Sequence, residues 1–111
     1  MDIVKFRKVL LERKRIAEEM QDSWDNGIKK CHEELIRILI EDIESTVEFL
    51  KTECTADEFS WLSEIFIEII DITQSQDFIE VLYELAKKYP EETEDYNVLY
   101  FIETAEKHLH K

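Results

Sequence analysis

The sequence predicts an all-α protein, and its composition and the spacing of its apolar residues support this fold class. The 111 residues include one Gly and one Pro, too few for the many tight turns of a β-sandwich or β-barrel. Apolar residues recur every three or four positions through long stretches rich in Glu, Lys, Leu and Ile, a pattern that favours helix. Hydrophobic residues make up 44% of the chain and charged residues 37%, so a core can form despite the charge. We expect a single domain over residues 1–111, folded as a compact bundle of five or six antiparallel helices.

The first helix is expected from Asp2 to about Asp25. Asp2 can cap its first turn, and Asn26-Gly27 is expected to end it, because both residues tolerate the left-handed conformation. Its apolar positions are Ile3, Phe6, Leu10, Ala17, Met20 and Trp24. Its other faces carry the basic residues Lys5, Arg7, Lys8, Arg13, Lys14 and Arg15.

A second helical stretch is expected from about Ile28 to Lys51, with a break near Glu41 as an open alternative. The spacing of its apolar residues is that of one helix face. This seam contains Leu35, Ile36, Leu39, Ile43, Val47 and Leu50. The outer face is acidic and contains Glu34, Glu41, Glu44 and Glu48.

The segment Thr55-Ala56-Asp57-Glu58 has the form of a capping box. In this motif Thr55 accepts a hydrogen bond from the Glu58 amide, and Glu58 accepts one from the Thr55 amide. The helix that starts here is expected to be the most buried one, because its apolar stripe is the widest in the chain. The expected core residues are Phe59, Leu62, Ile65, Phe66, Ile69 and Ile70, flanked by Trp61, Ile67 and Ile72. The polar strip of this helix contains Asp57, Glu64, Glu68 and Asp71.

Two further helices complete the predicted bundle. The first is expected to be capped by Ser75, or by Thr73 together with Gln76, and to end at Pro90. Its expected core residues are Phe78, Leu82, Leu85 and Tyr89. The last helix is expected between Glu91 and His110, with an interruption near Asn97 as an alternative. Its expected core residues are Tyr96, Leu99, Tyr100, Ile102, Ala105 and Leu109.

The net charge of −13 is distributed unevenly along the chain. Residues 1–30 contain eight Lys and Arg against six Asp and Glu, whereas residues 31–86 contain two against fifteen. Such an acidic field repels nucleic acid and anionic lipid and accelerates encounter with a cationic protein. We therefore predict a basic protein as the partner, with no binding to nucleic acid or membranes. An acidic surface that serves only solubility is the alternative.

The sequence shows no signal that directs the chain out of the cytoplasm. The longest run without a charged residue, from Tyr96 to Ile102, is far shorter than a membrane span or a signal-peptide core. A cytoplasmic location is therefore expected. In that compartment Cys31 and Cys54 are expected to be reduced thiols that pack in the interior.

One carboxylate pattern fits metal chemistry. Glu41-x-x-Glu44 and Glu68-x-x-Asp71 each place two carboxylates on one helix face, and four such groups can hold the magnesium ions that bridge a nucleoside triphosphate. The pattern resembles that of the MazG-like all-α nucleoside triphosphate pyrophosphohydrolases, and this resemblance implies that activity as an alternative function. The segment after the second pair, residues 72–76, lacks the basic residues that hold the phosphates in that family. We predict a protein that is not an enzyme and that has no catalytic residues, metal site or cofactor.

Acidic strips on two consecutive helices predict the partner-binding surface. If these helices form an antiparallel pair, the strips make one patch with an aromatic residue inside a charged rim, a composition typical of protein-binding surfaces. The predicted partner-binding residues are Glu64, Glu68 and Asp71 on the first helix and Asp77, Glu80, Tyr83 and Glu84 on the second.

As a physical type, this small acidic helical chain resembles bacterial immunity proteins, which neutralise toxins. Thr55-x-x-Glu58-Phe59 is similar to a capping segment in the helical immunity proteins of the nuclease colicins, whereas Tyr89-Pro90 has one tyrosine where those proteins have two. The resemblance implies that a rigid acidic face blocks the cationic cleft of a toxin domain such as a nuclease. An adaptor domain with no toxin partner is the remaining alternative.

Overall fold

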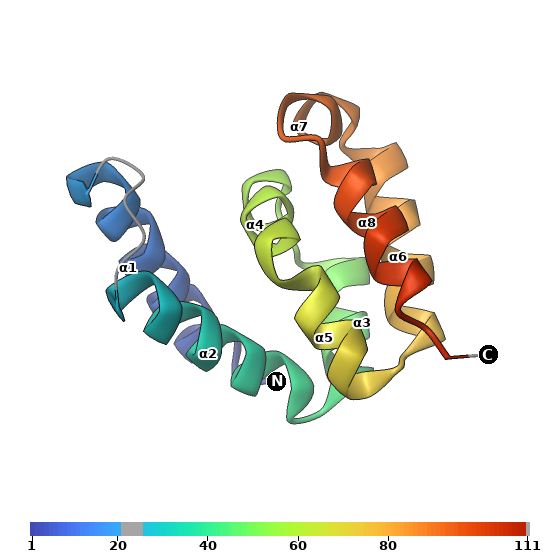
Figure 1. Ribbon diagram of the computed structural model, residues 1–111, viewed down its shortest axis with the longest axis horizontal. Helices are drawn as coiled ribbons and strands as arrows, with labels where there is room; N and C mark the ends of the chain where they lie inside the picture. Colours follow the sequence, from blue (N-terminus) through green and yellow to red (C-terminus); the bar gives the residue numbers. More distant parts are fainter. Residues whose placement is uncertain (21–25, 111) are drawn as a thin grey trace.

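The computed structural model describes residues 1–20 and 26–110 of the chain, and these residues form helices and no β-strand (Figure 1). The all-α bundle expected from the sequence is confirmed. The elements are α1 (Ile3–Met20), α2 (Asn26–Ile40), α3 (Ile43–Thr52), α4 (Ala56–Leu62), a 3-10 turn η1 (Ser63–Ile65), α5 (Phe66–Thr73), α6 (Gln76–Lys88), α7 (Pro90–Asp95) and α8 (Val98–Lys107). The helical segments outnumber the predicted helices because three of the longer stretches are interrupted, at residues 41–42, 63–65 and 96–97.

Local capping signals set the starts of several helices, as predicted. Asp2 Oδ1 accepts a hydrogen bond from the Lys5 amide at 3.0 Å. The capping box is complete, with Glu58 N to Thr55 Oγ1 at 3.1 Å and Thr55 N to Glu58 Oε1 at 3.0 Å. Of the two caps considered for α6, Ser75 is the one used, because its hydroxyl accepts from the Phe78 amide.

The prediction that Asn26-Gly27 ends a helix is wrong. These two residues form the start of α2. Asn and Gly are favourable at a helix N-terminus as well as after a C-terminus, so the pair does not by itself say which end it marks. The structure does not describe residues 21–25, which include the predicted helix end near Asp25 and the predicted core position Trp24. The side chain of Met20, another predicted core position, is also outside the described part.

The helices share one large core, and Figure 1 shows how they are arranged. α1 lies along α2, and α2 also contacts α3 and α5. α4 and α5 follow one another through the middle of the molecule, and α7 forms the corner at which the chain turns from α6 into α8. α8 packs against both α5 and α6, and α3 packs against the same α6. Because α8 packs against both helices, it lies close to the acidic strips of α5 and α6.

The centre of the core is made by the helices that follow the capping box. Phe66 is fully buried and its ring contacts those of Phe59, at 5.9 Å between centroids, and Phe78, at 6.2 Å. All six residues predicted as core in this stretch are buried, namely Phe59, Leu62, Ile65, Phe66, Ile69 and Ile70. Ile72, which was expected to widen the stripe, is 58% exposed. It lies about 200° around the helix from Ile70 and therefore faces away from the core.

The predicted core of the last helix is wrong at three positions. Tyr96, Leu99 and Tyr100 are 59%, 42% and 58% exposed. Asn97 adopts the left-handed conformation, with φ 52° and ψ 40°, and separates α7 from α8. A periodicity cannot continue across such a break, and the buried stripe of α8 instead has its own register. This stripe contains Val98, Ile102, Ala105 and the partly buried Leu109.

Both cysteines are buried free thiols. Burial raises the pKa of Cys54 to about 12 and also raises the pKa of Cys31. The prediction that they are reduced packing residues agrees with this placement.

In the described part of the chain, no helix is both long and apolar enough to cross a membrane.

Replacement of Phe66 by Ala tests the core. Phe66 is fully buried between two other rings, so the cavity left by Phe66→Ala should lower the free energy of unfolding by about 3–5 kcal/mol. The measurement is urea denaturation followed by circular dichroism. Val4→Ala is the control, since Val4 is 80% exposed and its loss should cost less than about 0.5 kcal/mol. A similar small cost for both variants would contradict the assignment of Phe66 to the core.

Candidate functional site

Part of the positive charge of α1 is paired with acidic residues of the same chain. Three of its cations, Arg7, Arg13 and Lys14, lie against acidic residues of α4 and η1. Opposite charges at this contact offset part of the repulsion within the acidic block. Three ion pairs join these elements, Arg7–Glu58 at 2.8 Å, Arg13–Glu64 at 2.7 Å and Lys14–Asp57.

Arg13 and Glu64 form the most buried of these pairs. Arg13 is 7% exposed, donates two hydrogen bonds to Glu64, and places its guanidinium carbon 5.0 Å from the centre of the Trp61 ring. His32 Nε2 lies 2.8 Å from the same carboxylate. Burial by itself raises the pKa of Glu64, but hydrogen bonds from His32 and Arg13 and their charges outweigh burial and lower it. Glu64, predicted to bind a partner, is therefore held by groups within the chain.

One residue of each predicted acidic strip is hydrogen-bonded to α8 or to the residue that follows it. On α5, Asp71 Oδ1 lies 2.6 Å from His108 Nδ1, just after the end of α8. On α6, the Tyr83 hydroxyl donates a 2.8 Å hydrogen bond to Glu106. Burial and this bond raise the pKa of Tyr83 to about 12. The strips of α5 and α6 therefore do not form one continuous patch around Tyr83, because α8 packs against both helices.

The remaining predicted residues are exposed, and most of them lie on α6. Glu68 is on α5, whereas Asp77, Glu80 and Glu84 are on α6. α3 packs against α6 and carries the exposed residues Glu44 and Glu48. We use the name acidic α3–α6 face for the five exposed acids of these two helices, which also carry the exposed Lys51, Lys87 and Lys88: Glu44, Glu48, Asp77, Glu80 and Glu84. Glu44 and Glu48 were missed as part of the candidate site, because nothing local in the sequence predicts that α3 and α6 are neighbours.

A second exposed surface lies where α7 meets α8. Tyr96, Leu99 and Tyr100 are exposed there, and we call these three residues the aromatic corner. Helical periodicity did not predict this surface, because it placed all three residues in the core. Two signals were available. Asn tolerates the left-handed conformation that interrupts a helix, and the stripe from Val98 to Leu109 fits helical spacing without the tyrosines.

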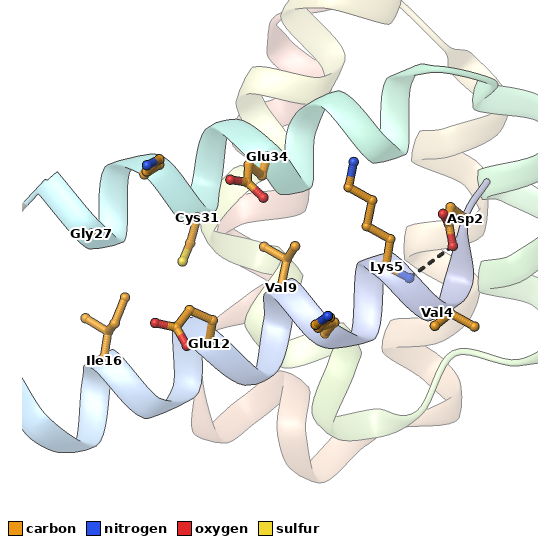
Figure 2. A pocket seen from close by; sticks show the side chains of 11 residues that line it. Asp2, Val4, Lys5, Val9, Glu12, Ile16, Gly27, Cys31 and Glu34 are labelled. Carbon is orange, nitrogen blue, oxygen red and sulfur yellow. Dashed lines mark hydrogen bonds between the residues drawn. The ribbon is translucent and has the colours of Figure 1, made fainter.

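A groove with a volume of about 740 Å³ lies between α1 and α2 (Figure 2). Its apolar floor includes Val9, Ile16 and Cys31. Its charged lining is balanced, with Lys5, Lys8 and Lys30 against Asp2, Glu12 and Glu34. The groove therefore differs in charge from the rest of the molecule and does not extend the acidic surface.

The four carboxylates of the metal pattern are not assembled into a site. Glu41 lies in the turn before α3 and Glu44 in its first turn, whereas Glu68 and Asp71 lie on α5. Across residues 1–20 and 26–110, no three His, Cys, Asp or Glu side chains lie close enough together to hold a metal ion.

Comparison of the chain with protein-family models, curated proteins and solved structures found no match. The charge and shape of the surface are therefore the features that bear on function.

The Arg13–Glu64 pair predicts a pH dependence of stability. The folded state lowers the pKa of Glu64 and also of Glu58, where bonds from Arg7 and Thr55 outweigh burial. A carboxyl group whose pKa is lowered by folding stabilises the protein above its unfolded pKa, and this contribution is lost as the pH falls through the folded pKa. We expect Glu64→Gln to lower the free energy of unfolding at pH 7 by about 2 kcal/mol, because a charged hydrogen bond is lost beside the buried Arg13.

Urea denaturation of wild type and Glu64→Gln between about pH 7 and pH 3 checks this expectation. The variant should lose less stability than wild type over this range. Glu68→Gln is the matched control, because Glu68 is exposed and should follow the wild-type curve. Parallel curves for wild type and Glu64→Gln would show that the pair does not stabilise the fold.

A turnover assay tests the pyrophosphohydrolase alternative. Purified protein with magnesium or manganese and a panel of nucleoside triphosphates is expected to release no pyrophosphate above background, because the four carboxylates are not gathered. Glu68→Gln and Glu80→Gln serve as a pair, since only Glu68 belongs to the metal pattern. Turnover that is abolished by Glu68→Gln and kept in Glu80→Gln would favour the enzyme instead.

Proposed function

We propose that the protein binds a cationic partner protein through its acidic surface and acts by binding, not by catalysis. The observation that carries this proposal is the acid excess that remains after internal pairing. Residues 31–86 contain fifteen Asp and Glu against two Lys and Arg. Cations of α1 pair with three of these acids, whereas the acidic α3–α6 face stays exposed.

The size of this excess argues against a role in solubility alone. A net charge of about 2–8 is enough to keep a small domain soluble, and this chain carries −13. Like charges on one small surface also destabilise the compact state. A cationic partner removes that repulsion when it binds, and the same field steers the partner during encounter.

The partner that we propose is a toxin domain with a basic cleft, such as a nuclease, and the protein is then its immunity protein. A nuclease must bind a polyanion, so its active site is cationic. A rigid helical protein with an acidic face competes for such a cleft without resembling the substrate chemically. An adaptor domain with another cationic partner shares the same physical basis.

A growth assay in cells distinguishes a toxin partner from the cationic partner of an adaptor domain. The toxin encoded next to the gene for this chain, where there is one, is expressed with and without the protein, and growth is followed. Protection of growth, and a complex of the two purified proteins, are expected for an immunity protein. A neighbouring toxin that kills equally in both cases would contradict the immunity function.

Charge reversal tests the electrostatic basis of binding. The triple variant Glu68→Lys, Glu80→Lys and Glu84→Lys should lower the association rate with the cationic partner by about tenfold and should weaken its dependence on salt. Stopped-flow measurements at several salt concentrations give both quantities. Exposed charges contribute little to stability, so circular dichroism should show an unchanged fold.

A control variant separates local from overall charge. Reversal of Glu18, Glu33 and Glu34 on the α1–α2 hairpin changes the net charge by the same amount at another place. It should affect the association rate less than the first triple variant does. Equal effects of the two variants would show that only net charge matters, and no effect of either would contradict electrostatic steering.

A further inference from the structure

The aromatic corner concentrates the exposed apolar surface of the molecule. Among the described residues, six large hydrophobic side chains are exposed, and three of them are Tyr96, Leu99 and Tyr100. Tyrosine is enriched among the residues that dominate binding energy at protein interfaces, since it offers a large rigid ring and a polar tip. Isolated exposed apolar residues are common on protein surfaces, whereas a contiguous apolar patch marks an interaction site.

Buried residues and turn hydrogen bonds support the backbone beneath the corner. Val98, Ile102 and Ala105 are fully buried and fix α8 on the core. The amide of Tyr96 donates to the Glu92 carbonyl at 3.1 Å, and the amide of Asn97 donates to that of Glu94 at 3.3 Å. The Tyr100 ring meets Phe101 edge-on, at 5.5 Å. A surface that is already ordered loses little conformational entropy when a partner binds.

A hollow of about 360 Å³ adjoins Tyr96. Trp61, Phe101 and Tyr96 supply aromatic walls, and the Arg13–Glu64 pair also lines it. Because Arg13 is already paired with Glu64, the hollow presents no unpaired positive charge to an incoming cation. Its volume lies at the small end of the range for ligand pockets, which suits the insertion of a partner side chain.

The segment that carries the corner has charges of one sign. Residues 91–103 contain five carboxylates and no Lys or Arg. None of the ion pairs among the described residues includes any of these five, which are Glu91, Glu92, Glu94, Asp95 and Glu103. Rings within an acidic rim attract Arg and Lys through both the ring faces and the carboxylates.

We infer that the aromatic corner is the docking site for a cationic protein surface, in which Arg or Lys side chains alternate with apolar ones. This inference rests on the proposed function and names its interface. The apolar residues of the partner cover Leu99 and enter the hollow beside Tyr96, while its cations lie over the tyrosine rings and beside the carboxylates of α7. A second copy of this chain does not suit the corner, because it brings a net charge of −13 against an acidic rim.

Nuclear magnetic resonance of the full ¹⁵N-labelled chain tests the inference. The probe is a short synthetic peptide in which Arg and Leu alternate, and the matched peptide has Glu in place of Arg. The Arg–Leu peptide is expected to shift the amide signals of residues 96–100 and the indole signal of Trp61 most strongly, and the Glu–Leu peptide is expected not to bind. The double variant Tyr96→Ala and Tyr100→Ala should bind the Arg–Leu peptide about tenfold more weakly.

Two control variants separate the aromatic faces from general effects. Tyr96→Phe with Tyr100→Phe keeps the rings and should retain most of the affinity. Val4→Ala with Leu11→Ala removes exposed apolar side chains on α1 and should bind as wild type does. Circular dichroism checks that each variant is folded.

The other outcomes contradict the inference in distinguishable ways. Shifts centred on the acidic α3–α6 face would overturn the corner as the docking site and leave the proposed function standing. No binding of the cationic peptide at millimolar concentration would overturn both. Self-association through residues 96–100 without peptide, seen by sedimentation, would assign the corner to a second copy.

Discussion

The ion pair between Arg13 and Glu64 is the interaction on which the arrangement of this acidic molecule depends. Arg13 is almost fully buried, and one of its nitrogens, Nη1, has no hydrogen-bond partner among the described residues. A buried guanidinium is costly unless its charge is compensated. The carboxylate of Glu64 and the ring of Trp61 supply that compensation. The pair thereby joins the basic first helix to η1, in the middle of the acidic block.

This use of α1 determines which charges are left for a partner. Its contact with α4 and η1 neutralises acids near the centre of the molecule, and Phe6 and Leu10 of the same helix enter the core. The exposed acids of α3, α6 and α7 take part in no ion pair among the described residues, although α3 itself contacts α1 through Phe49. The molecule therefore has an internally balanced side around the α1–α2 hairpin and an unbalanced acidic remainder, and the proposed binding function belongs to that remainder.

The position of α8 has a comparable effect on the aromatic residues. Because α8 packs against both α5 and α6, Tyr83 is bonded to Glu106 and Asp71 is bonded to His108. The same docking, in the register set by Val98 and Ile102, turns Tyr96 and Tyr100 outward. An aromatic residue within an acidic surface was expected on α6, where Tyr83 is partly buried and bonded to Glu106, whereas the exposed tyrosines lie at the turn between α7 and α8.

The sequence by itself determined the helices, their caps and the central core. The capping box at Thr55 and Glu58, the Ser75 cap and the buried stripe from Phe59 to Ile70 all depend on residues three or four positions apart, and such interactions are local. The acid excess was likewise fixed by composition. Only the tertiary structure decided which acids are paired and which aromatic residues are exposed. Arg13 and Glu64 are 51 residues apart, and Tyr83 and Glu106 are 23 apart. Such contacts depend on how whole helices dock. The register of α8 likewise depends on one left-handed residue, Asn97, and the apolar composition of α8 does not reveal that register.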